Sequence, residues 1–352
     1  GRVIDGETGL PLANASVFIN NSTRGTITNA AGEFSLGPYS PGVYEVVASF
    51  VGYENLLYVA DMKSGPVKIR FQLTKKEKQI REILILTNET RQRYLEIFKN
   101  YLLGFTSAAR RCKIKNLRDV QFTPGSNRND VIAYSDSTLV IDNPELGYTV
   151  HFDLLDFYFN QQTGESRFYG YTRFVDKNGE GENKRRWAKH RREAYDGSTQ
   201  HFFRSLAQRT LKEEGFTVQQ VYRKEMKRQE DVPNVIMLNG NGSNSMDIAV
   251  PVTEDSLLQL YSDSGYKIYE IKTADRLRVI FNKNTALKIA ITKERIVGGQ
   301  PPQGTVTGIS PIHPPVLLDY KGRLHTPLSI YYDGIWSFER LANLLPDDYE
   351  RE

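Results

Sequence analysis

Apolar and polar residues alternate in short runs over the first 73 residues, and turn residues separate these runs. In residues 67–73 every second position is apolar, which is the period of a strand with one face in solvent. Residues 43–51 are largely apolar on both faces, so we expect this strand to lie in the middle of a sheet. Short strands bounded by Gly, Asn and Pro predict an all-β sandwich over residues 1–73.

Helical and extended patterns are mixed after a charged connector, which we place at residues 74–88. From Asn88, a candidate N-cap, apolar residues recur at helical spacing until Gly104, which predicts an amphipathic helix. A second helix is expected around Trp187 and a third after Ser198. The other expected elements are strands over 120–175 with a hairpin turn at 161–165, a loop at 223–247, a hairpin of 277–281 with 287–291, an irregular segment at 298–315 and a final helix at 336–345. Residues 89–352 are therefore predicted to form a mixed α+β domain, and the whole chain is α+β.

Composition allows two hydrophobic cores and excludes several classes of protein. The chain has 352 residues, of which 39% are hydrophobic, and a core stops growing below this size. No run approaches the roughly 18 consecutive apolar residues of a membrane-spanning helix, so we expect no transmembrane segment. The net charge of +4 is too small to predict a nucleic-acid partner. A single cysteine, Cys112, excludes an internal disulfide and a thiolate metal cluster.

Several N-terminal segments have a distinctive order and spacing, and these are 1–5, 8–17, 25–28, 32–34, 44–50 and Gly52-Tyr53. Together they resemble a known family, the carboxypeptidase-regulatory-like domain. The resemblance implies a transthyretin-like β-sandwich without catalytic residues, found chiefly in secreted and envelope proteins of Bacteroidetes. It also implies location in the cell envelope, in the periplasm or associated with the outer membrane, after export through a leader not present in this chain.

Five short segments of the remaining chain carry a second resemblance, and these are 185–187, 194–198, 201–203, 212–216 and 344–346. Through them the remainder of the chain is similar to uncharacterised envelope proteins with the same N-terminal module, and that group brings no known activity.

Candidate catalytic residues are few. His190 and Glu193 lie three residues apart, and with His313 they would have to converge to form the zinc site of a peptidase. The cations beside His190 repel Zn²⁺, and a solvated pair on a charged helix explains the spacing without a metal. Cys112 lies among cations that could lower the pKa of its thiol, but a buried thiol at a helix-to-strand junction is the favoured interpretation. We predict no catalytic residue, no metal ligand and no cofactor.

The densest charge in the chain is a candidate binding surface for lipid phosphates, lipopolysaccharide or an acidic partner. Its residues are Lys184, Arg185, Arg186, Trp187, Lys189, Arg191 and Arg192. The alternative is a solvated helix face with Trp187 pointing inward, which we favour.

The sequence therefore predicts a non-catalytic binding or scaffold protein of the cell envelope. Its partner is expected to be an envelope protein or a glycan, and peripheral association with a membrane is open. A zinc-dependent peptidase or other envelope hydrolase is one alternative. A glycan-binding module that uses exposed Tyr and Trp rings is another.

Overall fold

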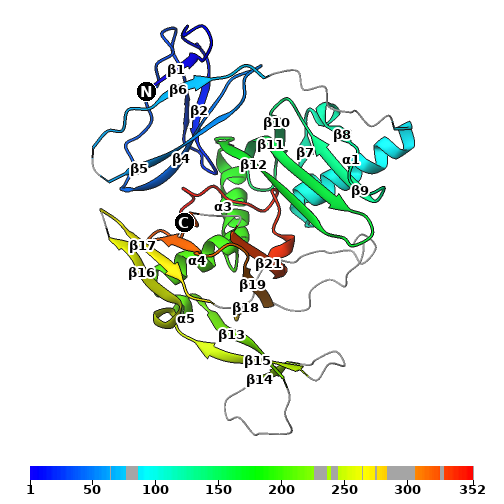
Figure 1. The fold of residues 1–352 in the computed structure, drawn as a ribbon, viewed down its shortest axis with the longest axis vertical. Helices are drawn as coiled ribbons and strands as arrows, with labels where there is room; N and C mark the ends of the chain where they lie inside the picture. The colour runs from blue at the N-terminus through cyan, green and yellow to red at the C-terminus, as the bar shows by residue number, and fades with distance from the viewer. Residues whose placement is uncertain are drawn as a thin grey trace. The chain divides into compact units, whose positions relative to one another are not determined.

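The computed structural model describes residues 1–63, 65–76, 86–225, 236–238, 245–263, 265–273, 276–283, 306–325 and 329–351. The chain divides into two units (Figure 1). The first includes Gly1–Arg192 and Arg340–Glu352, and the second includes Glu193–Leu287 and Pro302–Glu339. The sandwich at the N-terminus thus shares a unit with the sheet that follows it. Whether residues 1–73 fold independently stays a prediction.

The predicted N-terminal sandwich is confirmed. An antiparallel sheet with the order β3-β2-β4-β5 faces a parallel pair of β1 and β6. The bounds are β1 (Arg2–Asp5), β2 (Ser16–Ile19), β3 (Gly25–Ile27), β4 (Gly42–Ser49), β5 (Leu56–Met62) and β6 (Arg70–Leu73). The alternating apolar residues of both sheets, such as Val17, Val46 and Phe71, form one core. β4 is central as expected, whereas the strand predicted at 67–73 begins only at Arg70.

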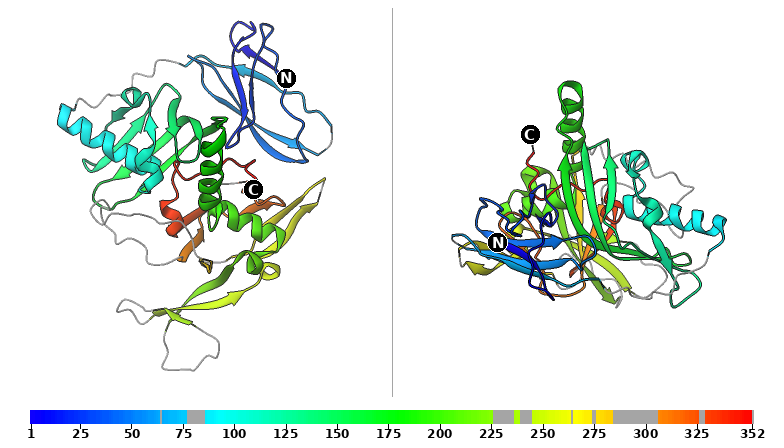
Figure 2. Two further views of the ribbon diagram at one scale, coloured as in Figure 1. Left: turned by 180° about the vertical axis from the view of Figure 1, so that it is seen from behind. Right: turned by 90° about the horizontal axis from the view of Figure 1, so that it is seen from above.

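A second sheet of the first unit carries the predicted helix on one face. Its order is β7-β10-β11-β9-β8, with β12 on the other side of β11. The bounds are α1 (Asn88–Leu103), α2 (Ser107–Arg111), β7 (Lys113–Ile114), η1 (Leu117–Asp119), β8 (Gln121–Thr123), β9 (Asp130–Tyr134), β10 (Leu139–Asn143), β11 (Tyr148–Asn160), β12 (Ser166–Asp176) and α3 (Gly181–Tyr195). Figure 2 shows α1 along this sheet. The rings of Phe98 and Phe157 pack against each other in a tilted arrangement, with centroids 4.7 Å apart. The N-cap of α1 is Thr87, one residue before the expected Asn88.

The long hairpin of β11 and β12 organises this sheet. β12 pairs with β11 along its whole length, while β10 and β9 share the opposite edge of β11. The turn between the two strands falls at the predicted residues 161–165. The outer face of the sandwich packs here, because Phe18 and Val47 contact Tyr171 of β12.

The second unit packs helix α4 against two further sheets. Their orders are β14-β15-β13-β18-β19-β21 and β16-β17-β20. The bounds are α4 (Thr199–Gln208), α5 (Leu211–Glu214), β13 (Phe216–Glu225), β14 (Ile236–Leu238), β15 (Ser245–Val252), α6 (Glu254–Leu257), β16 (Leu258–Asp263), β17 (Lys267–Ile271), β18 (Arg276–Phe281), β19 (Val306–Pro311), β20 (Leu317–Asp319), β21 (Ile330–Gly334) and η4 (Ile335–Phe338). Phe202 and Leu206 of α4 lie in the core with Trp336. The predicted cap Ser198 accepts a hydrogen bond from the His201 backbone N–H.

Several expectations for the second half of the chain need correction. Residues 306–311 form the strand β19 within the segment expected to be irregular, and β14 interrupts the predicted loop. The final helix is only the short η4, because the backbone N–H groups of Leu341 and Ala342 donate to the carbonyls of Leu102 and Leu103. Residues 287–291, half of the expected hairpin, lie outside the described residues. Among the described helices, none combines the length and the apolar character needed to cross a membrane.

Candidate binding surface on helix α3

One side of α3 holds the turn that joins β10 to β11. Trp187, His190 and Arg191 lie at positions i, i+3 and i+4, so their side chains share one face of the helix. The Trp187 Nε1–H donates to the Pro144 carbonyl at 2.9 Å, and the Arg191 Nε–H donates to the Leu146 carbonyl at 2.7 Å. The backbone carbonyls of the turn are thus satisfied by side chains of the helix, which fixes α3 on the sheet.

The turn is shaped to receive the Trp187 ring. Asn143 Oδ1 accepts from the backbone N–H groups of Glu145 and Leu146, and this closes the turn. Gly147 has φ +71°, and a Cβ atom there would lie 2.2 Å from the indole. Glycine is therefore required both by the backbone and by the close approach of the ring. Trp187 is 9% exposed, as expected for the inward-facing residue of the helix.

Arg191 belongs to the same inner face, which corrects its assignment to the exposed surface. Its side chain is 15% exposed and forms an ion pair with Asp176 at 2.9 Å. Its guanidinium lies 3.9 Å from the centroid of the Tyr148 ring, a cation–π geometry. The position four residues after Trp187 was the sequence signal for this role, because i and i+4 residues lie side by side on a helix.

The other five cations form what we call the α3 cationic face. Its members are Lys184, Arg185, Arg186, Lys189 and Arg192, all exposed. Arg185, Lys189 and Arg192 follow the i, i+4, i+7 spacing and form a row opposite Trp187. Arg186 donates to Asn183 Oδ1. Within the described residues, Lys184, Arg185 and Arg192 form no ion pair. The structure thus exposes five of the seven residues predicted as a binding surface.

His190, of the predicted zinc alternative, already has partners in the turn before β11. His190 Nδ1 lies 3.2 Å from both the Glu145 carbonyl and Glu145 Oε1, so this nitrogen carries a proton and donates. His313 belongs to the second unit. The described part of the chain contains no group of three or more His, Cys, Asp or Glu side chains able to hold a metal ion.

Sequence reasoning missed a pair in the second unit between a buried imidazole, His201, and a partly exposed carboxylate, Glu214. His201, on α4, accepts at Nδ1 from the Gly197 backbone N–H at 3.0 Å, so Nε2 carries the proton and donates to Glu214 Oε2 at 3.0 Å. Both ring nitrogens are therefore engaged, and neither can act as a general base. The pair ties the start of α4 to the end of α5.

Two further groups could in principle react, the Cys112 thiol and the Ser137 hydroxyl beside Asp119, but both have structural roles. Cys112 ends α2 at the junction with β7, and burial raises the pKa of its thiol to about 12.

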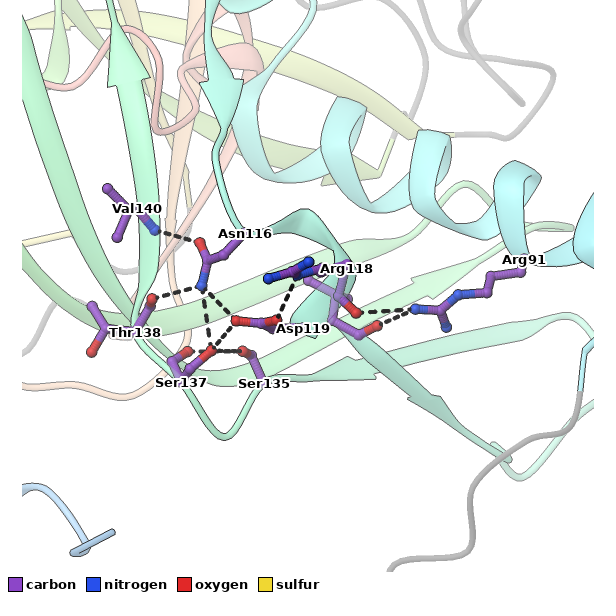
Figure 3. Close-up of polar contacts among 9 residues, drawn as sticks. Arg91, Asn116, Arg118, Asp119, Ser135, Ser137, Thr138 and Val140 are labelled. Carbon is purple, nitrogen blue, oxygen red and sulfur yellow. Dashed lines mark hydrogen bonds and ion pairs between the residues drawn. The ribbon is translucent and has the colours of Figure 1, made fainter. Parts of the chain in front are cut away.

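In Figure 3, Ser137 Oγ donates to Asp119 Oδ2 at 2.7 Å, and Asn116 Nδ2 donates to the same atom. These hydrogen bonds lower the pKa of Asp119, so its carboxylate is too weak a base to activate Ser137. The network joins the β7–β8 connection to the turn between β9 and β10.

Both tryptophans of the chain lie inside the protein. Trp336 donates from Nε1 to the Gly197 carbonyl at 2.8 Å and is 4% exposed. A glycan-binding site built on tryptophan rings therefore does not form in the described arrangement.

The N-terminal sandwich also contains a polar link between its first strand, β1, and the turn that joins β4 to β5. Tyr53 donates its hydroxyl proton to Asp5 Oδ2 at 2.6 Å, and the backbone N–H groups of Glu7 and Thr8 donate to Oδ1. Asp5 and the Gly52-Tyr53 pair are among the residues on which the predicted resemblance rests. Residues 1–85 match the CarboxypepD_reg-like domain. A comparison with curated proteins gave no match.

The match confirms the resemblance of the N-terminal module. It extends the CarboxypepD_reg-like domain beyond the sandwich strands into the predicted connector and covers about a quarter of the chain. The α3 cationic face lies outside this domain. Its role therefore has to be argued from its own geometry, and the similarity of the later segments to other envelope proteins stays a prediction.

Proposed function

We propose that the chain is a non-catalytic binding or scaffold protein of the cell envelope, and that its α3 cationic face binds an anionic partner. The observation that carries the proposal is an exposed row of cations on a helix whose opposite side is anchored by Trp187 and Arg191. Because the helix is already fixed, little conformational entropy is lost when a partner binds. The cell-envelope location rests on the resemblance of the N-terminal module.

Phosphate groups at a membrane surface are the partner that this face fits best. Arg185 and Arg192, in the row of cations, form no ion pair with any residue that the structure describes. Such a row suits a surface on which many negative charges are distributed. Each Lys or Arg close to an anionic membrane contributes about 1 kcal/mol. Such binding weakens as salt is added, because the charges are exposed.

Sedimentation with lipid vesicles tests the proposal. The purified chain should sediment with vesicles that contain phosphatidylglycerol but not with pure phosphatidylcholine, and salt should release it. The double variant Arg185→Glu/Arg192→Glu should bind at least about tenfold more weakly, because two favourable charges become repulsive. Arg93→Glu, an exposed arginine of α1, is the matched control and should leave binding nearly unchanged.

Equal vesicle binding by the double variant and the wild type would show that α3 is not the contact surface. The wild type could instead fail to bind either lipid and bind an acidic envelope protein or glycan through the same residues. That result would keep the α3 cationic face as the binding surface but would contradict the proposed membrane partner.

A further inference from the structure

The CarboxypepD_reg-like domain contains a cavity of about 510 Å³. It arises from the mismatch between the two sheets of the sandwich, four strands against two. β1 and β6 cannot cover the whole inner face of the larger sheet, so residues before β4 and described residues after β5 form the rest of the wall, and the cavity stays partly open to solvent. The volume lies within the range of about 300–1,000 Å³ typical of small-molecule sites.

Most of the inner surface of the cavity is apolar. Its most buried lining residues are Ile19, Val46 and Ile69, which belong to the sandwich core. Phe34, Leu36, Met62 and Val67 also line it. An empty apolar cavity leaves such side chains without part of their dispersion contacts, and an apolar ligand would supply them.

The walls are held in place by contacts of their own. The Phe34 ring packs near Phe71, with centroids 6.0 Å apart, and Tyr39 packs near Tyr44 at 5.3 Å. The Tyr44 hydroxyl donates to the Ser40 carbonyl at 2.8 Å, which fixes the segment before β4. These contacts favour a preformed cavity over a collapsed one.

The charge at the cavity is positive. Lys63 and Lys68 line it and are exposed, whereas no described Asp or Glu is among the lining residues. Lys63 pairs with Asp61 at 3.3 Å. Lys68 forms no ion pair with any residue that the structure describes. A ligand that enters this site is therefore favoured when its polar end is an anion.

We propose that the cavity binds a single-chain amphiphile, with its apolar chain against Ile19, Val46 and Ile69 and its anionic head at Lys68. The site is separate from α3 and does not depend on the function proposed for that helix.

Titration calorimetry with laurate, kept below its micelle concentration, tests the site on the full chain. Saturable one-to-one binding is expected. Lys68→Glu should weaken laurate binding about tenfold, which corresponds to about 1.4 kcal/mol, and should leave the binding of neutral 1-dodecanol unchanged. The control variant Lys113→Glu, at an exposed lysine of β7, should change neither the binding of laurate nor the binding of 1-dodecanol.

A second test fills the cavity with a larger side chain. Val67→Trp and Leu36→Trp approach it from different segments and should each abolish the binding of both ligands. Val59→Trp, at a residue 56% exposed on β5, should bind like the wild type. Circular dichroism identifies the variants that fold, and laurate should raise the melting temperature of the wild type but not that of a filled variant.

The proposal would be overturned if the wild type showed no saturable binding of laurate. Undiminished binding by a folded cavity-filling variant, or equal losses with Val59→Trp, would overturn it too. Binding only to laurate micelles or to phosphatidylglycerol vesicles would assign the contact to a lipid surface and would equally reject the cavity.

Discussion

Trp187 joins α3 to the sheet beneath it through both shape and a hydrogen bond. Replacing it with Ala should lower the free energy of unfolding by about 3–5 kcal/mol, because burial is lost and a cavity remains. Arg185→Ala, on the opposite side of the same helix, should change it by no more than about 0.5 kcal/mol. Urea unfolding of the two variants measures the difference. A small effect of Trp187→Ala would show that the indole contributes little to packing.

Asp5 is held in its ionised form inside the CarboxypepD_reg-like domain. The hydrogen bond from Tyr53, followed by those from the backbone N–H groups of Thr8 and Glu7, lowers the pKa of Asp5. A lowered pKa stabilises the fold above the ordinary aspartate value of about 4, and this stabilisation is lost as pH falls through the lower folded pKa.

Asp5→Asn should therefore be less stable than the wild type at pH 7, and the difference should shrink below about pH 4. Urea midpoints measured at a series of pH values check this. A difference that is the same at every pH would mean that the ionised carboxylate has no special role.

At the scale of an element, the carboxylate of Glu339 contacts the first residue of helix α4 and so affects the stability of that helix. Oε2 accepts from the Thr199 backbone N–H at 3.3 Å and from its hydroxyl at 3.1 Å, while Oε1 is buried and has no hydrogen-bond partner among the described residues. Burial raises the pKa of Glu339 to about 8, and the Thr199 hydrogen bonds oppose this shift.

The raised pKa means that the protonated form is favoured in the folded state. The contribution of Glu339 to the free energy of unfolding is then at its full value below about pH 4.5, the ordinary glutamate pKa, and is lost as pH rises through about 8. Glu339→Gln should remove this loss, so its melting temperature relative to the wild type should be higher at pH 9 than at pH 5. Parallel melting curves across this range would contradict the assignment.

The C-terminal segment links distant elements of the first unit. Besides the hydrogen bonds from Leu341 and Ala342 to the end of α1, the Asp347 backbone N–H donates to the Asn21 carbonyl at 2.6 Å. Asp348 accepts from the Thr23 backbone N–H at 2.9 Å and pairs with Arg24. The segment therefore ties the sandwich to the helix that follows it.

Asp348→Ala should accelerate hydrogen exchange at the Thr23 amide, because this N–H loses its acceptor. The cost in global stability should stay below about 1 kcal/mol, since the ion pair with Arg24 is exposed. Amide exchange followed by NMR gives the local value, and Glu7→Ala is a control that should not affect Thr23. An unchanged exchange rate at Thr23 would contradict the link.

At the scale of the whole molecule, the sandwich has a core of its own. Every buried residue of that core lies between Val3 and Leu73, although Phe18 and Val47 on its outer face are covered by Tyr171. A fragment of residues 1–76 should fold with a β-type circular dichroism spectrum and melt cooperatively. It should melt below the full chain, because that outer face becomes exposed. A disordered fragment would show that the sandwich depends on β12.

The sequence by itself determined the features that follow from local periodicity and turn chemistry. These include the central strand β4, the helix α1, the β11–β12 turn, the Ser198 cap and the inward position of Trp187. Each depends on residues within one or two turns or on the two-residue repeat of a strand, so neighbours along the chain are sufficient.

Only the tertiary structure decided the features that join distant residues. Arg191 left the cationic face because Asp176 and Tyr148 lie beside it, and His201 became a structural residue through Gly197 and Glu214. The segment around Leu341 failed to form its predicted helix because carbonyls more than 230 positions earlier accept its N–H groups. The cavity follows from the unequal sizes of two facing sheets. Such outcomes depend on which elements pack together, and local patterns do not encode that choice.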